Sequence, residues 1–305
     1  MTIMKRIFLA TAGLALTMTL TQCCGTAQKT ADDDSMPLMK GTVSTFNYDV
    51  TDGTGSTISK TAQVYVPQEY DKTDTAKKYN VLYLAHGGGD NQGSFFDPQR
   101  SPQPLDAVMD SLTTAGLAEP MIIVCPTYYT GTDDPHKDMQ STIDDCRRFH
   151  AELRDFLIPA IEREYNVFTT REHRAYGGFS MGSLSTWYQL AYGTDEVKYY
   201  IPLSGDLWVY DDEGQKVSAA EAAGWLQERL AATPYGKHDV SVWGYTGSRD
   251  IACRPENALV GELMQHDGLL EYGVNLRYSV FEGGDHQYKY INQYLAEVIP
   301  SLFRE

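Results

Sequence analysis

One turn between a strand and a helix constrains the fold of this chain more than any other feature. Residues 173–179 form a short apolar run that predicts a buried strand, and residues 184–192 have the pattern of a helix. Between them, Gly178, Ser180 and Gly182 form a G-x-S-x-G motif. This motif places a serine on a sharp turn, and its glycines let neighbouring backbone approach closely. Ser180 would then lie at a helix N-terminus, where unpaired N–H groups favour a developing negative charge; a plain turn serine is the alternative.

Strand-like and helix-like runs alternate along the rest of the chain. Such alternation predicts an α/β fold, with a mostly parallel central sheet and helices on both faces. Binding and catalytic sites of such sheets lie at the carboxyl ends of the strands. Pro159 is expected to kink or divide the longest helical segment, and Pro300 to end the last one. The predicted strands are 43–50, 62–66, 79–85, 121–125, 199–203, 240–245 and 275–281, and the predicted helices are 105–115, 139–165, 219–232, 256–266 and 287–299.

The domain organisation follows from length and composition. A chain of 305 residues with 42% hydrophobic content can bury one large core. After residue 40 the sequence contains no Pro/Ser-rich linker, internal repeat or low-complexity run, which favours a single domain over residues 41–305. We interpret residues 1–22 as a signal peptide of the lipoprotein type, and residues 23–40, with three consecutive aspartates, as a solvated tether.

The N-terminus has the layout of a secretory signal. Lys5 and Arg6 precede an uncharged, largely apolar run over residues 7–20, which is too short for a membrane span. The run ends at Cys23 and Cys24, and this junction resembles a bacterial lipobox, in which a cysteine becomes the lipidated first residue of the mature protein. Either cysteine is a candidate, and a plain signal peptide with incidental cysteines is the alternative. The hypothesis is an exported bacterial lipoprotein anchored in the periplasm, at the outer membrane or on the cell surface.

Cysteine content and charge exclude several kinds of site and partner. Beyond the signal only Cys125, Cys146 and Cys253 remain, an odd number without metal-like spacing, which argues against a disulfide framework and a zinc site. We expect three buried thiols, with one disulfide as the alternative. Loss of Lys5 and Arg6 with the leader leaves 23 basic residues against 41 acidic ones, a charge of about −18. Nucleic acid is therefore excluded as a partner, since phosphate binding needs the opposite sign.

Two residues downstream of Ser180 complete a pattern typical of nucleophilic catalysis. A serine hydroxyl needs a base within hydrogen-bond reach and an acid that orients the base. Asp250 comes just past a predicted strand, and His286 comes just past the next. Alone, Asp250 could cap the following helix and His286 could be a surface turn residue. In the order Ser, Asp, His, and at successive strand ends, they predict a catalytic triad.

An oxyanion hole needs two backbone N–H donors, one from the residue after the nucleophile and one from a loop after an early strand. Met181 is the first candidate. Residues 86–91 follow an early strand and contain three glycines, of which Gly88 is the second candidate. His86 in this loop is expected to be a packed or hydrogen-bonded anchor. No metal cluster, Gly-rich phosphate motif or other cofactor signature is present in the sequence, so we expect no cofactor.

From Tyr79 to Arg304 the chain resembles the feruloyl esterases of carbohydrate esterase family one, especially the esterase modules attached to bacterial xylanases. The resemblance implies an α/β-hydrolase fold, a triad of Ser180, Asp250 and His286, and an aromatic substrate pocket to which Trp208 contributes. The segments that carry it are Leu84–Gly89, Pro126–Tyr128, Gly177–Gly182, Thr186–Tyr188, Pro202–Trp208, Thr246–Ala252 and the segment around His286.

The same resemblance suggests a substrate. A hydroxycinnamoyl group is flat, largely apolar and carries a phenol, so its pocket should offer an aromatic wall with a few polar groups. Trp208 is the candidate wall, with Asp206 and Tyr128 as polar partners. Relatives often carry an aromatic residue after the catalytic histidine where this chain has Gln287, so the resemblance does not fix the shape of the acyl pocket.

The sequence thus predicts a serine esterase that removes acyl groups, most simply feruloyl groups, from plant cell-wall polysaccharide. Its expected partners are an acylated polysaccharide or oligosaccharide and, through the lipid anchor, a membrane. The alternatives on the same scaffold are an acetyl-xylan esterase and a siderophore or thioester hydrolase. A further alternative is a non-catalytic, glycan-binding surface lipoprotein.

Overall fold

The computed structural model describes residues 39–51, 54–130 and 138–304, and these belong to one compact unit. The expected signal peptide, most of the tether and the lipidation candidates Cys23 and Cys24 lie outside the described residues. None of the helices described is long and apolar enough to cross a membrane.

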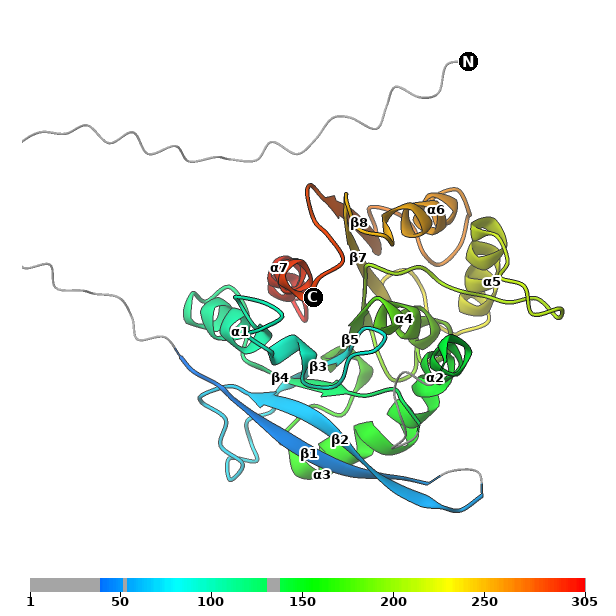
Figure 1. Cartoon of the computed structure of the whole chain (residues 1–305). Helices are drawn as coiled ribbons and strands as arrows, with labels where there is room; N and C mark the ends of the chain where they lie inside the picture. The colour runs from blue at the N-terminus through cyan, green and yellow to red at the C-terminus, as the bar shows by residue number, and fades with distance from the viewer. Residues whose placement is uncertain (1–38, 52–53, 131–137, 305) are drawn as a thin grey trace, which may run out of the picture. The chain divides into compact units, whose positions relative to one another are not determined.

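The centre of the domain is an eight-stranded sheet in the order β1-β2-β4-β3-β5-β6-β7-β8 (Figure 1). The β1–β2 and β2–β4 pairs are antiparallel, and all other neighbouring pairs are parallel. This is the mostly parallel sheet that the sequence predicts. The strands are β1 (Thr42–Thr51), β2 (Thr57–Val66), β3 (Asn80–Ala85), β4 (Met121–Pro126), β5 (Arg174–Phe179), β6 (Tyr199–Leu203), β7 (Ser241–Gly247) and β8 (Leu276–Phe281).

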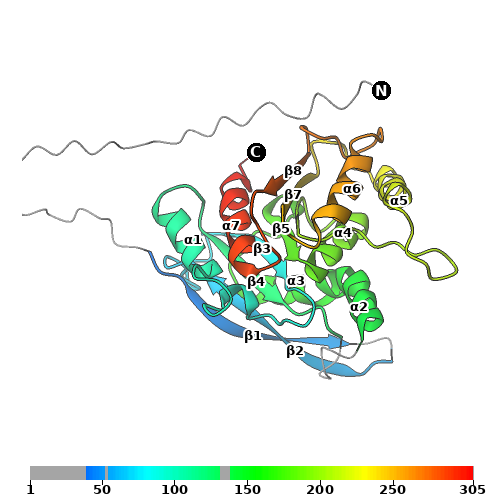
Figure 2. The ribbon, with the colours of Figure 1, turned by 45° about the horizontal axis from the view of Figure 1, so that its top comes forward.

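Helices cover both faces of the sheet, which explains why β3, β4 and β5 are buried along their whole length. On one face, α1 (Leu105–Thr114) and α7 (Tyr288–Val298) bury their apolar sides. The other face carries α2 (Met139–Glu152), α3 (Ile158–Glu164), α4 (Met181–Tyr192), α5 (Ala219–Ala231) and α6 (Cys253–Leu263). Figure 2 shows α1 and α7 on one side of the strands, with α4, α5 and α6 on the other.

The long helical segment predicted over residues 139–165 is divided. A π-helical turn, Leu153–Leu157, separates α2 from α3, and Pro159 lies in the first turn of α3. α2, the π turn and α3 follow one another without a break, and Ile158 N donates to the Leu153 carbonyl, so Pro159 lies within one continuous helical segment. A proline lacks an N–H and cannot continue the regular hydrogen-bond pattern, and the division expected at Pro159 is present as a π turn just before it.

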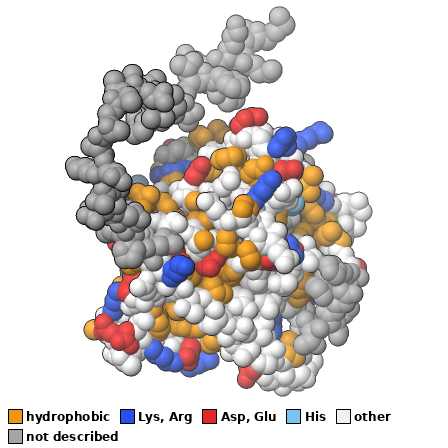
Figure 3. All heavy atoms as spheres, turned by 60° about the vertical axis from the view of Figure 1, so that its left-hand side comes forward, with side chains coloured by type: hydrophobic (Ala, Val, Ile, Leu, Met, Phe, Trp, Pro, Cys, Tyr) orange, Lys and Arg blue, Asp and Glu red, His pale blue; other side chains and the backbone are white. Residues whose placement is uncertain are grey.

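The remaining sequence expectations concern thiols and charge. Cys125, Cys146 and Cys253 are all free; the first two are buried as expected, whereas Cys253 is partly exposed. Figure 3 shows one face of the molecule, on which acidic and basic side chains are interspersed with apolar ones. The net negative charge is thus not gathered into a single patch on this face, which suits a charge that serves solubility.

Candidate active site

The turn between β5 and α4 holds Ser180 in a strained conformation. Its backbone has φ 57° and ψ −112°, a region that residues with a Cβ rarely adopt. The Ser180 N–H donates to the Leu203 carbonyl at 3.0 Å, and the Ser180 carbonyl accepts from Ser183 N at 2.9 Å. The neighbouring strand and the first helical turn therefore fix the backbone on both sides of the strained residue.

The two glycines of the motif are required by close packing. A Cβ on Gly182 would lie 2.1 Å from the Ala85 carbonyl oxygen, and one on Gly178 would lie 2.4 Å from the Gly182 oxygen. Both distances are far below van der Waals contact. The start of α4 thus packs directly against the end of β3, and this packing brings Ser180 next to the loop that follows β3.

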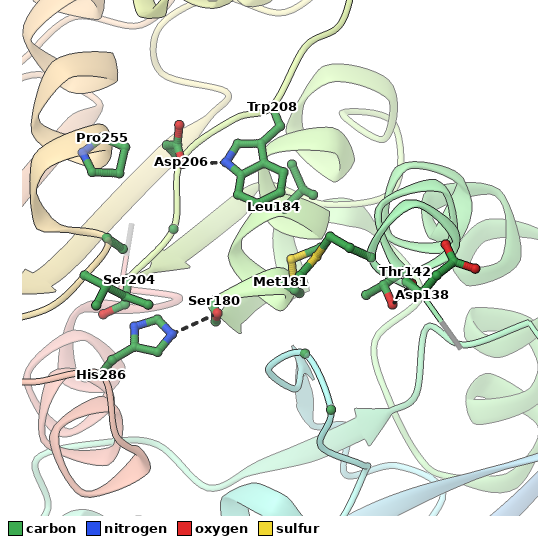
Figure 4. A pocket seen from close by; sticks show the side chains of 16 residues that line it. Asp138, Thr142, Ser180, Met181, Leu184, Ser204, Asp206, Trp208, Pro255 and His286 are labelled. Atoms are coloured by element: carbon green, nitrogen blue, oxygen red, sulfur yellow. Dashed lines mark hydrogen bonds between the residues drawn. The ribbon is translucent and has the colours of Figure 1, made fainter. Parts of the chain in front are cut away.

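Ser180, His286 and Asp250 form a hydrogen-bonded chain at the carboxyl ends of the strands. His286 Nε2 lies 2.9 Å from Ser180 Oγ (Figure 4), and His286 Nδ1 lies 2.7 Å from Asp250 Oδ1. Asp250 follows β7, and His286 follows β8. A carboxylate at Nδ1 fixes the tautomer in which Nδ1 carries the proton and Nε2 can accept one from the serine.

Two other acids considered for the role of Asp250 lie elsewhere. The Asp206 oxygens accept from Trp208 Nε1 at 2.7 Å and from Lys216 Nζ at 2.8 Å. Glu256 is fully buried, and its pKa is raised well above the usual value by burial and, second, by the charge of Asp250. Of these three acids, only Asp250 contacts His286.

Two backbone N–H groups next to Ser180 are free to bind an oxyanion. Among the described residues, neither Gly88 N nor Met181 N donates to another protein group. The flanking amides are occupied, because Gly87 N donates to Tyr288 Oη at 3.0 Å and Gly89 N donates to Tyr129 Oη at 2.8 Å. A Cβ on Gly88 would lie 2.9 Å from Met181 Cγ, so the two segments are in contact.

Two buried side chains, His86 and Tyr128, contact the loop after β3 through hydrogen bonds. His86 is fully buried, contacts the Gly87 carbonyl through Nδ1 and Thr127 Oγ1 through Nε2, and burial lowers its pKa to about 4. It is the hydrogen-bonded anchor that the sequence predicts. Tyr128 was expected to be a polar group of the substrate pocket, and this is wrong. Its side chain is fully buried, and its hydroxyl donates to the Gly87 carbonyl at 3.0 Å.

A cavity of about 700 Å³ opens beside Ser180 and His286. Trp208 and Asp206 line it, as the sequence predicts, and the remaining lining is largely apolar. Figure 4 shows the Trp208 ring and the Leu184 and Met181 side chains along this cavity. The other lining residues are Gly88, Gly89, Asp138, Met139, Thr142, Ser204, Gly205, Ile251, Ala252 and Pro255.

Residues 57–302 match the model of a protein family described as putative esterase. The chain belongs to this esterase family. It is 30% identical over 266 residues to endo-1,4-beta-xylanase Y of Acetivibrio thermocellus, covering 83% of this chain and 23% of that protein. It is also 30% identical over 208 residues to an endo-1,4-beta-xylanase/feruloyl esterase of Xylanibacter ruminicola, covering 60% of this chain and 28% of that protein. The chain thus spans about a quarter of the length of these curated relatives.

A solved structure shares the architecture of this chain. It is a serine-to-alanine mutant of the feruloyl esterase module from Clostridium thermocellum in complex with sinapinate, 29% identical in sequence. The TM-score is 0.72, and the alignment covers 87% of this chain and 89% of that one. The fold is therefore the α/β-hydrolase fold that the sequence predicts.

A second, smaller cavity of about 340 Å³ adjoins the esterase triad on the side of Gln287. The resemblance leaves the shape of the acyl pocket at Gln287 open, and the structure places this residue outside the larger cavity. The side chain lines the smaller cavity together with Arg100 and Asp90, and it is not among the residues that line the larger one. The reason is that Gln287 is the N-cap of α7, which packs on the opposite face of the sheet from α4 and α6.

Sequence reasoning missed the residues that hold the loop after β3, which carries the oxyanion-hole candidate Gly88. Tyr288 accepts from Gly87 N and donates to Asp90 Oδ2 at 3.0 Å. Arg100 in turn pairs with Asp90 and lies over the Tyr288 ring. No local pattern marks these residues, because their partners are up to 201 positions away along the chain.

The raised pKa of Glu256 predicts a pH-dependent effect of one substitution. A carboxyl that stays protonated when folded and ionises when unfolded makes stability fall as the pH rises above its ordinary pKa of 4.5. Glu256→Gln removes this titration and keeps the shape. The variant should therefore be more stable than the wild type at pH 8, and the difference should shrink towards pH 4. Urea unfolding between these pH values measures it.

The control for losing a carboxylate as such is Glu262→Gln, a partly exposed position on the same helix. The stability of this control relative to the wild type should not increase with pH. A Glu256→Gln variant that is less stable than the wild type at pH 8 would contradict the neutral state of Glu256.

Proposed function

We propose that this protein is a serine esterase that hydrolyses hydroxycinnamoyl esters on plant cell-wall polysaccharide through an acyl-enzyme. The observation that carries the proposal is the chain from Ser180 Oγ through His286 to Asp250, set between two free N–H groups and a largely apolar cavity. A nucleophile, an oriented base and an oxyanion site are the three parts that acyl transfer requires.

The first half of the reaction forms the acyl-enzyme. Ser180 Oγ attacks the ester carbonyl carbon while His286 Nε2 takes its proton. The N–H groups of Gly88 and Met181 bind the oxyanion of the tetrahedral intermediate. The intermediate collapses by breaking the bond to the alcohol oxygen, and His286 gives its proton to that oxygen. The alcohol leaves, and the acyl group remains on Ser180.

The second half regenerates the enzyme. A water molecule gives a proton to His286 and attacks the acyl carbon, and the bond to Ser180 Oγ breaks as the serine is reprotonated. Asp250 holds the imidazole in one orientation in both halves and stabilises the imidazolium that forms. Asp250 Oδ1 also accepts from Ala252 N at 2.7 Å, which fixes the carboxyl in turn.

The choice of a hydroxycinnamoyl group rests on the larger cavity. Its volume of about 700 Å³ suits a flat aromatic acid, and Trp208 supplies an aromatic wall. Asp206 fixes this ring through Nε1, and Lys216 Nζ lies 4.6 Å from the ring centroid. The solved feruloyl esterase module with a TM-score of 0.72 is in complex with sinapinate, which belongs to this class of acids.

The proposed nucleophile is tested by Ser180→Ala. The variant should fold and should lose at least about a thousandfold in turnover of methyl ferulate, because only oxyanion and substrate binding remain. It should also fail to react with a fluorophosphonate probe that labels the wild type. Near-normal turnover by the variant would refute the assignment. A wild type that neither reacts with the probe nor hydrolyses any ester of a panel would favour a non-catalytic protein.

The role of Asp250 is tested against a matched control in the same cavity region. Asp250→Asn should lower turnover by roughly three to four orders of magnitude, because an amide no longer fixes the right imidazole tautomer. Asp206→Asn keeps the triad and should cost less than about tenfold. Initial rates on methyl ferulate under identical conditions compare the two. A larger loss in the Asp206 variant would transfer the role to Asp206.

Trp208→Ala tests the acyl group. The loss of an aromatic contact should reduce kcat/KM for methyl ferulate. The reduction should correspond to a loss of about 1–3 kcal/mol in transition-state binding. Acetyl esters should be spared, since a two-carbon acyl group does not reach across the cavity. Equal losses on both substrates would make Trp208 a structural residue. A wild type that prefers acetylated xylan, or a thioester, to methyl ferulate would overturn the substrate class.

We also propose that the mature protein is a lipoprotein anchored through Cys23 or Cys24. The charged start, the apolar run and the paired cysteines support this. Each buried methylene contributes about 0.8 kcal/mol, so two or more acyl chains hold a protein on a membrane where one does not. Replacing both cysteines by serine should move the exported protein from the membrane fraction to the soluble one. Unchanged fractionation would favour another means of retention.

A further inference from the structure

Two cavities of different character meet at the reacting atoms. The larger is the apolar cavity with Trp208, and the smaller is the cavity of about 340 Å³ beside Gln287. Both are lined by Gly88, Ser180 and His286. A substrate whose carbonyl carbon reaches Ser180 Oγ therefore has two directions in which its remaining atoms can extend.

An ester has two halves that suit this arrangement. The acyl half lies on one side of the carbonyl carbon, and the alcohol half lies on the other. The alcohol oxygen must come within reach of His286 Nε2, since that nitrogen protonates it as it leaves. If the flat acyl group fills the larger cavity, the alcohol extends into the smaller one.

We propose that the smaller cavity is a subsite for a neutral, polyhydroxylated leaving group, that is, a sugar, and that Gln287 and Arg100 bind its hydroxyl groups. This inference rests on the proposed esterase function, and it names the alcohol half of the substrate. Gln287 and Arg100 thereby set specificity for the leaving group, whereas Trp208 sets specificity for the acyl group.

Gln287 has the chemistry and the position for this role. It directly follows His286 and stands at the N-cap of α7, where its side chain makes no capping hydrogen bond. The side chain is exposed, and among the described residues its carboxamide group makes no hydrogen bond. A free carboxamide offers two donors and one acceptor, which matches hydroxyl groups that both donate and accept.

Arg100 lines the same smaller cavity, and contacts with its neighbours fix its orientation. Its guanidinium pairs with Asp90, lies 3.6 Å from Asp97 Oδ2 and stands 5.4 Å from the centroid of the Tyr288 ring. The side chain remains 37% exposed, so part of a fork of five N–H donors faces the solvent. Two carboxylates beside one guanidinium leave no excess positive charge, which disfavours an anionic ligand such as a phosphate and suits an uncharged sugar.

The test compares two esters of one acid. Methyl ferulate has no sugar, whereas a feruloylated arabinoxylan oligosaccharide carries one as its alcohol. Gln287→Ala should reduce kcat/KM for the oligosaccharide by roughly three- to tenfold, mainly through KM, because hydrogen bonds of ordinary strength are lost. Its kcat/KM for methyl ferulate should stay within about twofold. Gln99→Ala, an exposed glutamine that does not line the cavity, should change neither value.

A second measurement probes the same subsite without the oligosaccharide. Added arabinose competes with water for the acyl-enzyme formed from methyl ferulate, and the ratio of arabinose ester to free acid reports binding of the sugar. The ratio should fall in Gln287→Ala and should be unchanged in Gln99→Ala. Gln287 is the residue to vary, because Arg100 also supports the oxyanion loop through Asp90 and Tyr288.

The outcomes separate this proposal from the proposed function. Equal losses on both esters in Gln287→Ala, or no loss on either, would overturn the sugar subsite while leaving the esterase intact. A wild type that does not hydrolyse methyl ferulate would instead overturn the proposed function. Selective loss on the oligosaccharide, together with the lower arabinose ratio, would establish the subsite.

Discussion

The close approach of α4 to the end of β3 is the constraint on which the site depends. Because Gly182 lies against the Ala85 carbonyl, the helix begins where no side chain can separate it from the strand. This contact holds Ser180 in its strained backbone conformation and brings Met181 N to the loop that carries Gly88. The proposed nucleophile and the two N–H groups proposed to bind the oxyanion are thus positioned by one piece of backbone packing.

Three buried acids near this turn, Asp206, Asp250 and Glu256, have different partners. Asp250 faces an imidazole, Asp206 faces an indole N–H and an ammonium group, and Glu256 lies fully buried beside Asp250. Burial and, second, the neighbouring carboxylate raise the pKa of Glu256 well above its usual value, which disfavours a second negative charge behind the triad. One carboxylate next to His286 is what the orientation of the base requires.

The sequence predicted the strands, the helices and the juxtaposition of Ser180, Asp250 and His286 because these follow from local patterns. Hydrophobic period and strand ends are local properties, and parallel strands bring their carboxyl ends to one edge. The error at Tyr128 has a different origin. Tyr128 stands at the right edge of the sheet, but the direction of its side chain depends on packing against distant segments. The support of Gly87 by Tyr288 could not be predicted for the same reason.

The residues of the triad follow strands that differ in burial and in pairing. Ser180 follows β5, which is buried throughout and paired on both sides, whereas His286 follows β8, a half-exposed edge strand whose one neighbouring strand in the described sheet is β7. Edge strands with few buried contacts open at lower free energy than the centre of a sheet. Partial opening of β8 would remove the base while the rest of the sheet stays intact. On heating, catalytic competence should therefore disappear before the far-ultraviolet circular dichroism signal, so that enzyme rate and secondary structure report two different melting events.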